Sequence, residues 1–358
     1  MSMYKILAIN PGSTSTKIAV FENTKVLLVK TLRHSSEELK PFRTIVDQYE
    51  FRKQIILDEL KNSGFDIACL DAIMGRGGLL KPILSGVYEV NGRMKEDLVK
   101  GVQGQHASNL GGLIADEIAK MTPKAKAYIA DPVVVDELID EARITGHPAF
   151  KRVSIFHALN QKAIARTHAR AIGRPYEELN FVIAHLGGGV SIGAHHKGKV
   201  VDVNNALDGA GPMSPERSGS LPAGQLAELC FSGKYTLDQV KKMILGEGGL
   251  MAHLGTNQAY EVEKMAEEGN AKAKLIQDAM CYQIAKWIGS TATVLKGEVH
   301  GILITGGMAN NKYLCDYVRE MVSYIAPVFI YPGEDEMGAL ATNGLMVLQG
   351  EIVPRVYE

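Results

Sequence analysis

Short apolar runs separated by turns of small and polar residues open both halves of the chain. Near the N-terminus the apolar positions predict strands over 4–9, 17–22 and 25–31, and the same pattern returns over 180–186, 190–196 and 199–204. In each half the first two strands flank a turn of small residues, within 10–17 (NPGSTSTK) and within 185–191 (HLGGGVS). Ser15 and Ser191 occupy matching places, almost half of the 358-residue chain apart. The repeat predicts two related lobes.

The remaining pattern alternates helices and strands. A polar amphipathic stretch predicts one long helix over 35–61, and an apolar run predicts a strand over 69–74 that ends in a glycine-rich turn at 75–78. Pro132 disfavours helical geometry at Asp131 and places it at the end of a strand. We also expect helices near 92–101 and 108–121, a long buried helix over 276–295, and a closing helix after 333–336. Further strands are expected over 126–130, 300–305 and 328–331, so the pattern indicates an α/β architecture.

Composition narrows the class of protein. Hydrophobic residues make up 46% and charged residues 22% of the chain, which is typical of a globular protein with a sizeable core. A net charge of −1 gives no general attraction to nucleic acid or to an anionic membrane. No leader-like segment and no run long enough to cross a bilayer are evident, so a cytoplasmic location is expected. The four cysteines show no metal-binding spacing and are expected to be buried, reduced thiols.

Two turns carry groups that bind anions. Asn10, Ser13, Ser15 and Lys17 offer an amide, two hydroxyls and an ammonium to phosphoryl oxygens, and residues 187–189 are three consecutive glycines whose backbone can approach an anion closely. An ordinary polar hairpin with Lys17 in solvent is the alternative for the first turn. The glycines 187–189 match neither the Walker A nor the dinucleotide-binding fingerprint. The repetition of the two turns at equivalent places favours phosphate binding.

Other candidates follow predicted strands or lie in turns. Gly306 and Gly307 form a third glycine turn, where a nucleoside could lie against the backbone, although a simple helix start is the alternative. Asp131 and Glu336 each follow an apolar strand and could hold Mg²⁺ through water, or could be exposed turn residues.

Four basic residues also stand in suggestive places. Arg76 and Arg217 lie in tight turns, from which a guanidinium group can bind a carboxylate or a phosphate, although many loop arginines are merely solvated. His157 begins an apolar helix and His185 ends a strand. Each histidine could instead be an ordinary core residue.

Taken in order, these motifs resemble the acetokinase family of the actin/hexokinase/Hsp70 superfamily. The resemblance rests on residues 10–17, 185–189, 217–219 (RSG) and 305–307 (TGG), and it covers nearly the whole chain. Residues 76–80 (RGGLL), 154–161 (SIFHALNQ) and 202–209 (DVNNALDG) are similar to the butyrate kinase branch of that family.

The resemblance implies a duplicated ribonuclease-H-like, actin-like fold with a nucleotide cleft between two lobes. The first lobe would contain 1–132 together with a returning helix in 338–358, and the second lobe would contain 133–337. It also implies ATP or ADP with Mg²⁺, and a homo-oligomer of two or more copies. In the motif positions, Asn10, Ser13, Ser15, Lys17, Gly187, Gly188, Gly189, Gly306 and Gly307 would bind the nucleotide, and Asp131 and Glu336 the metal.

The implied reaction is phosphorylation of a short-chain carboxylate to an acyl phosphate, with butyrate, isobutyrate and propionate as candidate substrates. Arg217, Arg76, His157, His185, Asp131 and Lys17 would serve catalysis. The family's second motif has Asn where this chain has Gly188, and the counterparts of Arg76 and Glu336 match only loosely. A sugar or polyol kinase of the same superfamily, and a non-catalytic actin-like or Hsp70-like protein, are the alternatives.

Overall fold

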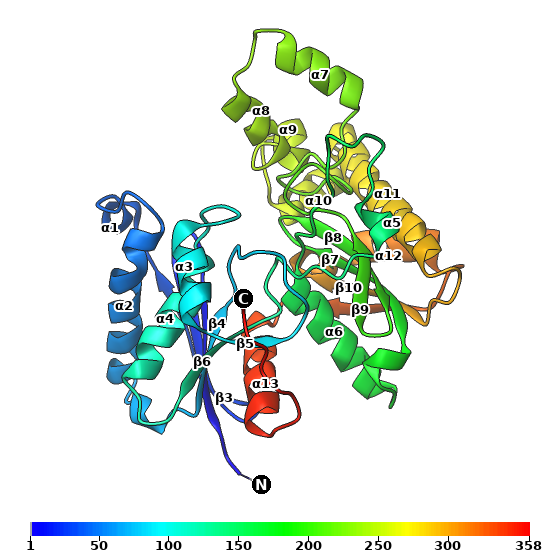
Figure 1. Cartoon of the computed structure of the whole chain (residues 1–358). Helices are drawn as coiled ribbons and strands as arrows, with labels where there is room; N and C mark the ends of the chain where they lie inside the picture. The colour runs from blue at the N-terminus through cyan, green and yellow to red at the C-terminus, as the bar shows by residue number, and fades with distance from the viewer. Residues whose placement is uncertain (1) are drawn as a thin grey trace. The chain divides into compact units, whose positions relative to one another are not determined.

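Two compact units make up the chain in the computed structural model, which describes residues 2–358 (Figure 1). The first unit contains the chain up to Val135 together with Asp335–Glu358, and the second contains Asp136–Glu334. Each unit has a mixed sheet and its own buried apolar cluster. Residues 133–135 and 335–337, which the sequence assigned to the second lobe, lie in the first unit.

The first sheet has six strands in the order β3-β2-β1-β4-β6-β5. Strands β1 to β3 form an antiparallel meander, whereas β4 and β6 continue the sheet parallel to β1. The bounds are β1 Lys5–Pro11, β2 Ser15–Glu22, β3 Lys25–Arg33, β4 Ala72–Arg76, β5 Val87–Glu89 and β6 Lys126–Ala130.

The second sheet repeats five of these strands in the order β11-β10-β7-β8-β9, with the same parallel and antiparallel pairings. Its bounds are β7 Asn180–Leu186, β8 Val190–His196, β9 Lys199–Val203, β10 Gly301–Gly306 and β11 Val328–Pro332. The duplicated α/β architecture expected from the sequence is therefore confirmed. Lys197 and Gly198, with φ values of 47° and 85°, form the expected hairpin turn between β8 and β9.

Helices cover both faces of the first sheet. Met74 faces Gly344 of α13, whereas its neighbour Gly75 faces Gly111 of α4, and successive strand residues point to opposite faces. Helix α13 thus returns the C-terminal segment to this sheet. The helices of this unit are α1 Ser36–Leu39, α2 Tyr49–Asn62, α3 Gly92–Lys100, α4 Asn109–Lys120 and α13 Glu336–Leu348, with 3₁₀ turns Val46–Gln48 and Ile67–Cys69.

The prediction of a single helix over 35–61 is wrong. Helix α1 ends at Leu39, two residues before Pro41, and α2 begins only at Tyr49. Proline disfavours helical geometry in the residue before it, so the polar pattern alone predicts a helix that is too long. The strand expected from residue 69 likewise begins only at Ala72.

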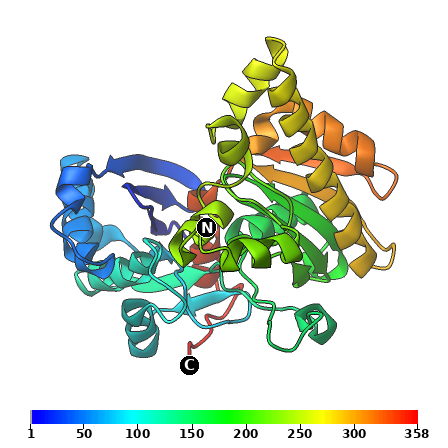
Figure 2. The same ribbon diagram turned by 90° about the horizontal axis from the view of Figure 1, so that it is seen from above.

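In the second unit, Ile192 and Ala194 of β8 belong to the apolar cluster that contains α11, whereas Gly193 between them faces Gln161 of α6. Helix α11, gold in Figure 2, is the long buried helix predicted from the stripe over 276–295. The helices are α5 Asp140–Arg143, α6 Ala158–Ala171, α7 Ala223–Phe231, α8 Leu237–Ile244, α9 Gly249–Leu254, α10 Ala259–Glu267, α11 Ala271–Val294 and α12 Lys312–Val322, with 3₁₀ turns Tyr176–Glu178 and Gly307–Asn310.

Two cysteines differ from expectation. Cys281 and Cys315 are buried, and burial raises the pKa of the Cys281 thiol to about 12, but Cys69 and Cys230 are exposed. Within residues 2–358, no helix combines the length and apolar character needed to cross a bilayer.

Candidate functional site

The first anion-binding turn lies between β1 and β2. The backbone N–H of Gly12 donates to the Ser15 carbonyl at 2.7 Å and closes the turn. Ser13 and Lys17 are exposed and Ser15 is half-buried. The structure therefore presents one ammonium and two serines at the mouth of a short hairpin, which is the chemistry that an anion requires.

Arg52 of α2 supports this turn from inside the first unit. Its Nη1 donates to the carbonyls of Gly12 at 2.7 Å and Ser15 at 3.1 Å, and its Nη2 donates to the Ser13 carbonyl at 3.0 Å. The side chain is fully buried and also donates to Gln48. Burial lowers the pKa of Arg52 to about 10, so the guanidinium remains charged at neutral pH behind the turn.

We expect Arg52→Met to loosen the turn and weaken anion binding there. The carbonyls of Gly12, Ser13 and Ser15 would lose a charged donor, and such bonds contribute about 1.5–3 kcal/mol each. The free energy of unfolding should fall by about 2–4 kcal/mol. Urea unfolding measures this change. Lys61→Met, at an exposed position of the same helix, is the control and should change stability by less than about 0.5 kcal/mol. Equal effects of both substitutions would contradict the role of Arg52.

Arg76 lies next to Asn10 and Glu336 in the first unit. Arg76 Nη1 donates to Glu336 Oε2 at 2.7 Å and to Asn10 Oδ1 at 3.3 Å, while the Asn10 amide donates to the same Glu336 oxygen. Glu336 is the first residue of α13, where a carboxylate is favoured by the helix dipole. Three predicted site residues, distant in sequence, therefore form one polar group.

Asp131 follows β6 directly, as expected, and is buried. Its backbone has φ = 37°, a left-handed conformation that is uncommon for a residue other than glycine. Its Oδ1 accepts from the Ser85 hydroxyl at 2.6 Å and from the Gly86 N–H at 2.8 Å. Asp131 thus also holds the loop before β5. Among the described residues, no three His, Cys, Asp or Glu side chains are grouped as a metal centre.

In the second unit, His157 and His185 stack with their ring centroids 3.8 Å apart and their planes 8° from parallel. His185 is buried at the end of β7, where its Nδ1 accepts from the Asn160 amide at 2.7 Å and its Nε2 lies 3.2 Å from Glu334 Oε1. His157 directly precedes α6. The structure thus brings together two histidines that were predicted separately.

Arg217 packs directly on the second glycine turn. A Cβ at Gly189 would lie 1.6 Å from Arg217 Nη1, so only glycine leaves room for the guanidinium group. Nη1 donates to the Ala206 carbonyl, and within residues 2–358 the buried Nε has no hydrogen-bond partner. Burial lowers the pKa of Arg217, and neighbouring Glu216 opposes this shift. The Ser214 hydroxyl ties the arginine loop to the turn by donating to the Gly188 carbonyl at 2.7 Å.

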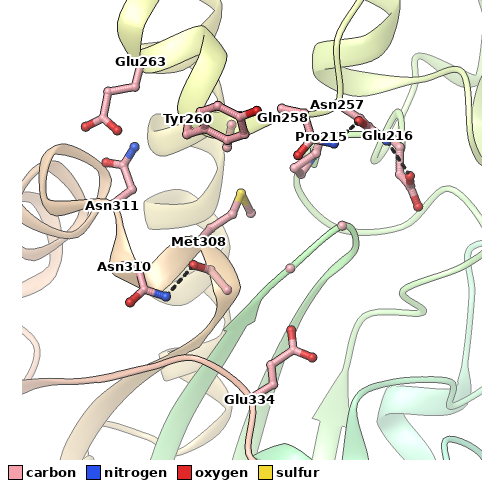
Figure 3. Close-up of a pocket in the computed structure, with 14 residues that line it drawn as sticks. Pro215, Glu216, Asn257, Gln258, Tyr260, Glu263, Met308, Asn310, Asn311 and Glu334 are labelled. Carbon is pink, nitrogen blue, oxygen red and sulfur yellow. Dashed lines mark hydrogen bonds between the residues drawn. The ribbon is translucent and has the colours of Figure 1, made fainter. Parts of the chain in front are cut away.

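A pocket of about 490 Å³ joins the second and third glycine turns (Figure 3). Gly187 and Gly188 line one part, and Gly307 lines another. Gly306 has φ = 97°, and a Cβ there would meet the Leu186 carbonyl oxygen at 2.3 Å, so this glycine lets the ends of β7 and β10 pack closely. The pocket is within the usual size range for small-molecule sites. Its other lining residues are mostly polar: Pro215, Glu216, Asn257, Gln258, Ala259, Tyr260, Glu263, Met308, Asn310, Asn311 and Glu334.

Several of these residues were not predicted. Asn310 and Asn311 follow the third glycine turn closely, so their position in the sequence could have suggested them. Asn257 and Tyr260 carry no such local signal, because the fold brings them to the pocket from a loop and a helix distant in sequence. Arg52 of the first unit, which supports the first turn, was not predicted either.

Comparisons with known proteins cover almost the whole chain. A family model described as "Acetokinase family" matches residues 150–326. The chain is 58% identical to butyrate kinase 2 and 54% identical to butyrate kinase 1 of Clostridium acetobutylicum, over 99% of this chain and at least 99% of each relative. A crystal structure of Porphyromonas gingivalis acetate kinase matches with a TM-score of 0.80 at 20% identity, over 96% of this chain and 100% of that one.

Proposed function

Because the chain belongs to the acetokinase family, and within it to the butyrate kinases, we propose that it transfers the terminal phosphoryl group of ATP to butyrate or a branched short-chain relative. The products are an acyl phosphate and ADP, and the reaction is reversible. The observation that carries this proposal is Arg217, a half-buried arginine whose buried Nε has no hydrogen-bond partner among the described residues, set on a glycine turn that lines a polar pocket. Such a cation suits an anionic ligand.

The proposed reaction needs no general base to activate the acceptor. A carboxylate ionises near pH 4, so the substrate is already a nucleophile at neutral pH. The protein has to align the acceptor with the phosphorus and stabilise charge on the transferring group. This demand fits a site built from hydrogen-bond donors and cations.

Each unit supplies part of that chemistry in our proposal. In the second unit, Arg217 orients the carboxylate and the phosphoryl group, His157 and His185 donate to phosphoryl oxygens, and the backbone of 187–189 binds phosphate. Gly307 lines the space proposed for the nucleoside together with the amides of Asn310 and Asn311, and Gly306 directly precedes it.

In the first unit, Asn10, Ser13, Ser15 and Lys17 bind phosphoryl oxygens, and Arg76 assists in orienting the acceptor. The Arg52 charge behind the turn favours an anion at that place.

Magnesium is proposed to be held through water by Asp131 and Glu336. Carboxylates with several retained waters are the ligands that Mg²⁺ prefers, and it would neutralise charge on the phosphates. Glu336 Oε2 already accepts from Arg76 and Asn10, which orients the carboxylate. Chelation by EDTA should abolish turnover and added Mg²⁺ should restore it; full activity in EDTA would contradict this part of the proposal.

The test of the proposed function is the rate of ADP release with acetate, propionate, butyrate, isobutyrate and valerate. We expect butyrate or isobutyrate to give the highest kcat/KM. Neighbouring acids should differ by about 10–200-fold at most, because one methylene contributes only about 1–3 kcal/mol. Equal or better efficiency with acetate would contradict the butyrate assignment. Hydroxylamine trapping separates a sugar or polyol kinase, because only an acyl phosphate gives a hydroxamate.

We also propose that a second copy of the chain covers the arm formed by α7 and α8. Helix α7 has no buried residue, and Phe231 and Leu237 are 92% and 68% exposed. Grouped apolar side chains of this kind are uncommon on the surface of a monomer. Light scattering should give at least twice the 38.8 kDa chain mass, and a monomeric mass would contradict the assembly.

A further inference from the structure

A line of hydrogen bonds inside the second unit leads to His157. His157 Nδ1 lies 2.9 Å from Ser191 Oγ, which lies 2.9 Å from Gln161 Nε2. Gln161 Oε1 lies 2.9 Å from His195 Nε2, and His195 Nδ1 lies 2.6 Å from the Tyr176 hydroxyl. Ser191, Gln161 and His195 are completely buried. Phosphoryl transfer as proposed above gives none of these three a task, yet burying polar groups is costly unless their bonds are satisfied.

The backbone fixes the direction of the line. Gln161 Nε2 also lies 3.0 Å from the Ser191 carbonyl oxygen, which can only accept. The amide nitrogen of Gln161 therefore faces Ser191, and its oxygen faces His195. His195 must donate from Nε2, so its Nδ1 accepts the Tyr176 hydroxyl hydrogen.

The neighbouring donors also fix the direction of the Ser191 O–H hydrogen. Ser191 Oγ accepts from Gln161 Nε2 and from the His157 backbone N–H at 3.4 Å. Both of its lone pairs are then used, so its own hydrogen is directed to His157 Nδ1. A neutral imidazole that accepts at Nδ1 carries its proton on Nε2.

We infer that Tyr176, His195, Gln161 and Ser191 act as positioning residues that hold neutral His157 with its proton on Nε2. His157 then donates from Nε2 to a phosphoryl oxygen without first gaining a second proton. The inference deepens the proposed function and rests on it for the identity of the acceptor oxygen.

The residues around this line of hydrogen bonds keep His195 neutral and Gln161 in position. Burial, together with the nearby charges of Lys162 and Arg166, lowers the pKa of His195 well below its usual value. Lys162 pairs with Glu137 at 2.7 Å, which compensates the buried ammonium. A Cβ at Gly193 would lie 2.7 Å from Gln161 Oε1, so this glycine leaves the space that the amide needs.

Nitrogen-15 NMR of the full chain tests the inference directly. Imidazole spectra are recorded without nucleotide at about pH 8, above the ordinary histidine pKa of about 6.5, and the His157 signals are assigned with His157→Gln. We expect a protonated Nε2 and an accepting Nδ1 at His157. A wild-type His157 protonated on Nδ1 would overturn the inference, whatever the variants do.

Two variants then test the source of this preference. Ser191→Ala removes the donor to Nδ1, and Gln161→Met frees the serine to accept from His157, so both should populate the Nδ1-protonated form. Tyr331→Phe is the matched control, because it removes the 2.7 Å bond between Tyr331 and His168 Nδ1 in the same unit, outside the line. An unchanged His157 spectrum in both test variants, or a changed one in the control, would also overturn the inference.

Kinetics supply the second readout. We expect kcat to fall about tenfold in Ser191→Ala and Gln161→Met, since a donor is lost for part of the time, with KM for ATP within about twofold. Tyr331→Phe should keep both constants. A chain with His157 protonated on Nε2 but without kinase activity would disprove the proposed function and leave the tautomer assignment standing. An active kinase with Nδ1 protonated would disprove the tautomer assignment alone.

Discussion

Arg217→Ala lowers kcat for acyl phosphate formation by about 10²–10³-fold, because a donor aimed at developing charge usually contributes that much. The change leaves the Ala206 carbonyl oxygen without its guanidinium donor and removes the cation from the second glycine turn. Arg217→Lys keeps the charge but not the forked geometry, so it should recover only part of the loss. Steady-state kinetics with saturating ATP measure the effect.

The matched control is Arg319→Ala on α12, where an exposed arginine pairs with Asp316. This variant should show wild-type kinetics. Near-normal turnover of Arg217→Ala would remove Arg217 from the proposed mechanism.

Gly189→Ala produces a loss of similar size without removing any charged group. The added methyl would lie 1.6 Å from Nη1 and 2.3 Å from Cζ of Arg217, so the guanidinium must move. A displacement of about 1 Å in a group that aligns reactants can lower the rate about 10²-fold. We therefore expect kcat/KM to fall about 10²-fold, and Gly189→Ala combined with Arg217→Ala to be little worse than Arg217→Ala alone.

Gly289→Ala in α11 is the control for this pair, because nothing lies within 4 Å of a Cβ built there. Alanine also favours a helix interior, so stability should stay equal or rise slightly. Full additivity of the Gly189 and Arg217 changes would contradict the view that the glycine acts through the arginine.

Local pattern predicted the fold well where one feature dominated. Alternation and helical spacing are local properties, so the sequence predicts several elements correctly. These are the two strand–turn–strand units that begin each half of the repeat, the hairpin at Lys197 and the buried helix α11. The helix expected over 35–61 failed because Pro41 outweighs the polar pattern around it. The prediction that Cys69 and Cys230 are buried was wrong, because composition does not determine whether a single residue lies in the core or on the surface.

The candidate site was predicted in its parts but not in its arrangement. The sequence marks Arg76 and Glu336 as separate candidates, and the fold pairs them at 2.7 Å across 260 positions of the chain. It likewise marks His157 and His185, but their stacking follows only from the fold. Arg52 was missed because an arginine in a polar helix normally faces solvent, and only the packing of α2 against the first turn buries it.

In the proposed reaction a carboxylate oxygen attacks the terminal phosphorus of ATP. Butyrate labelled with oxygen-18 in both carboxyl positions tests it most directly, with ATP, Mg²⁺ and hydroxylamine present and the released phosphate analysed by mass spectrometry. Hydroxylamine attacks the acyl carbon, so direct transfer predicts phosphate that carries one labelled oxygen, together with ADP. Unlabelled phosphate, or label in AMP, would contradict direct transfer to the carboxylate.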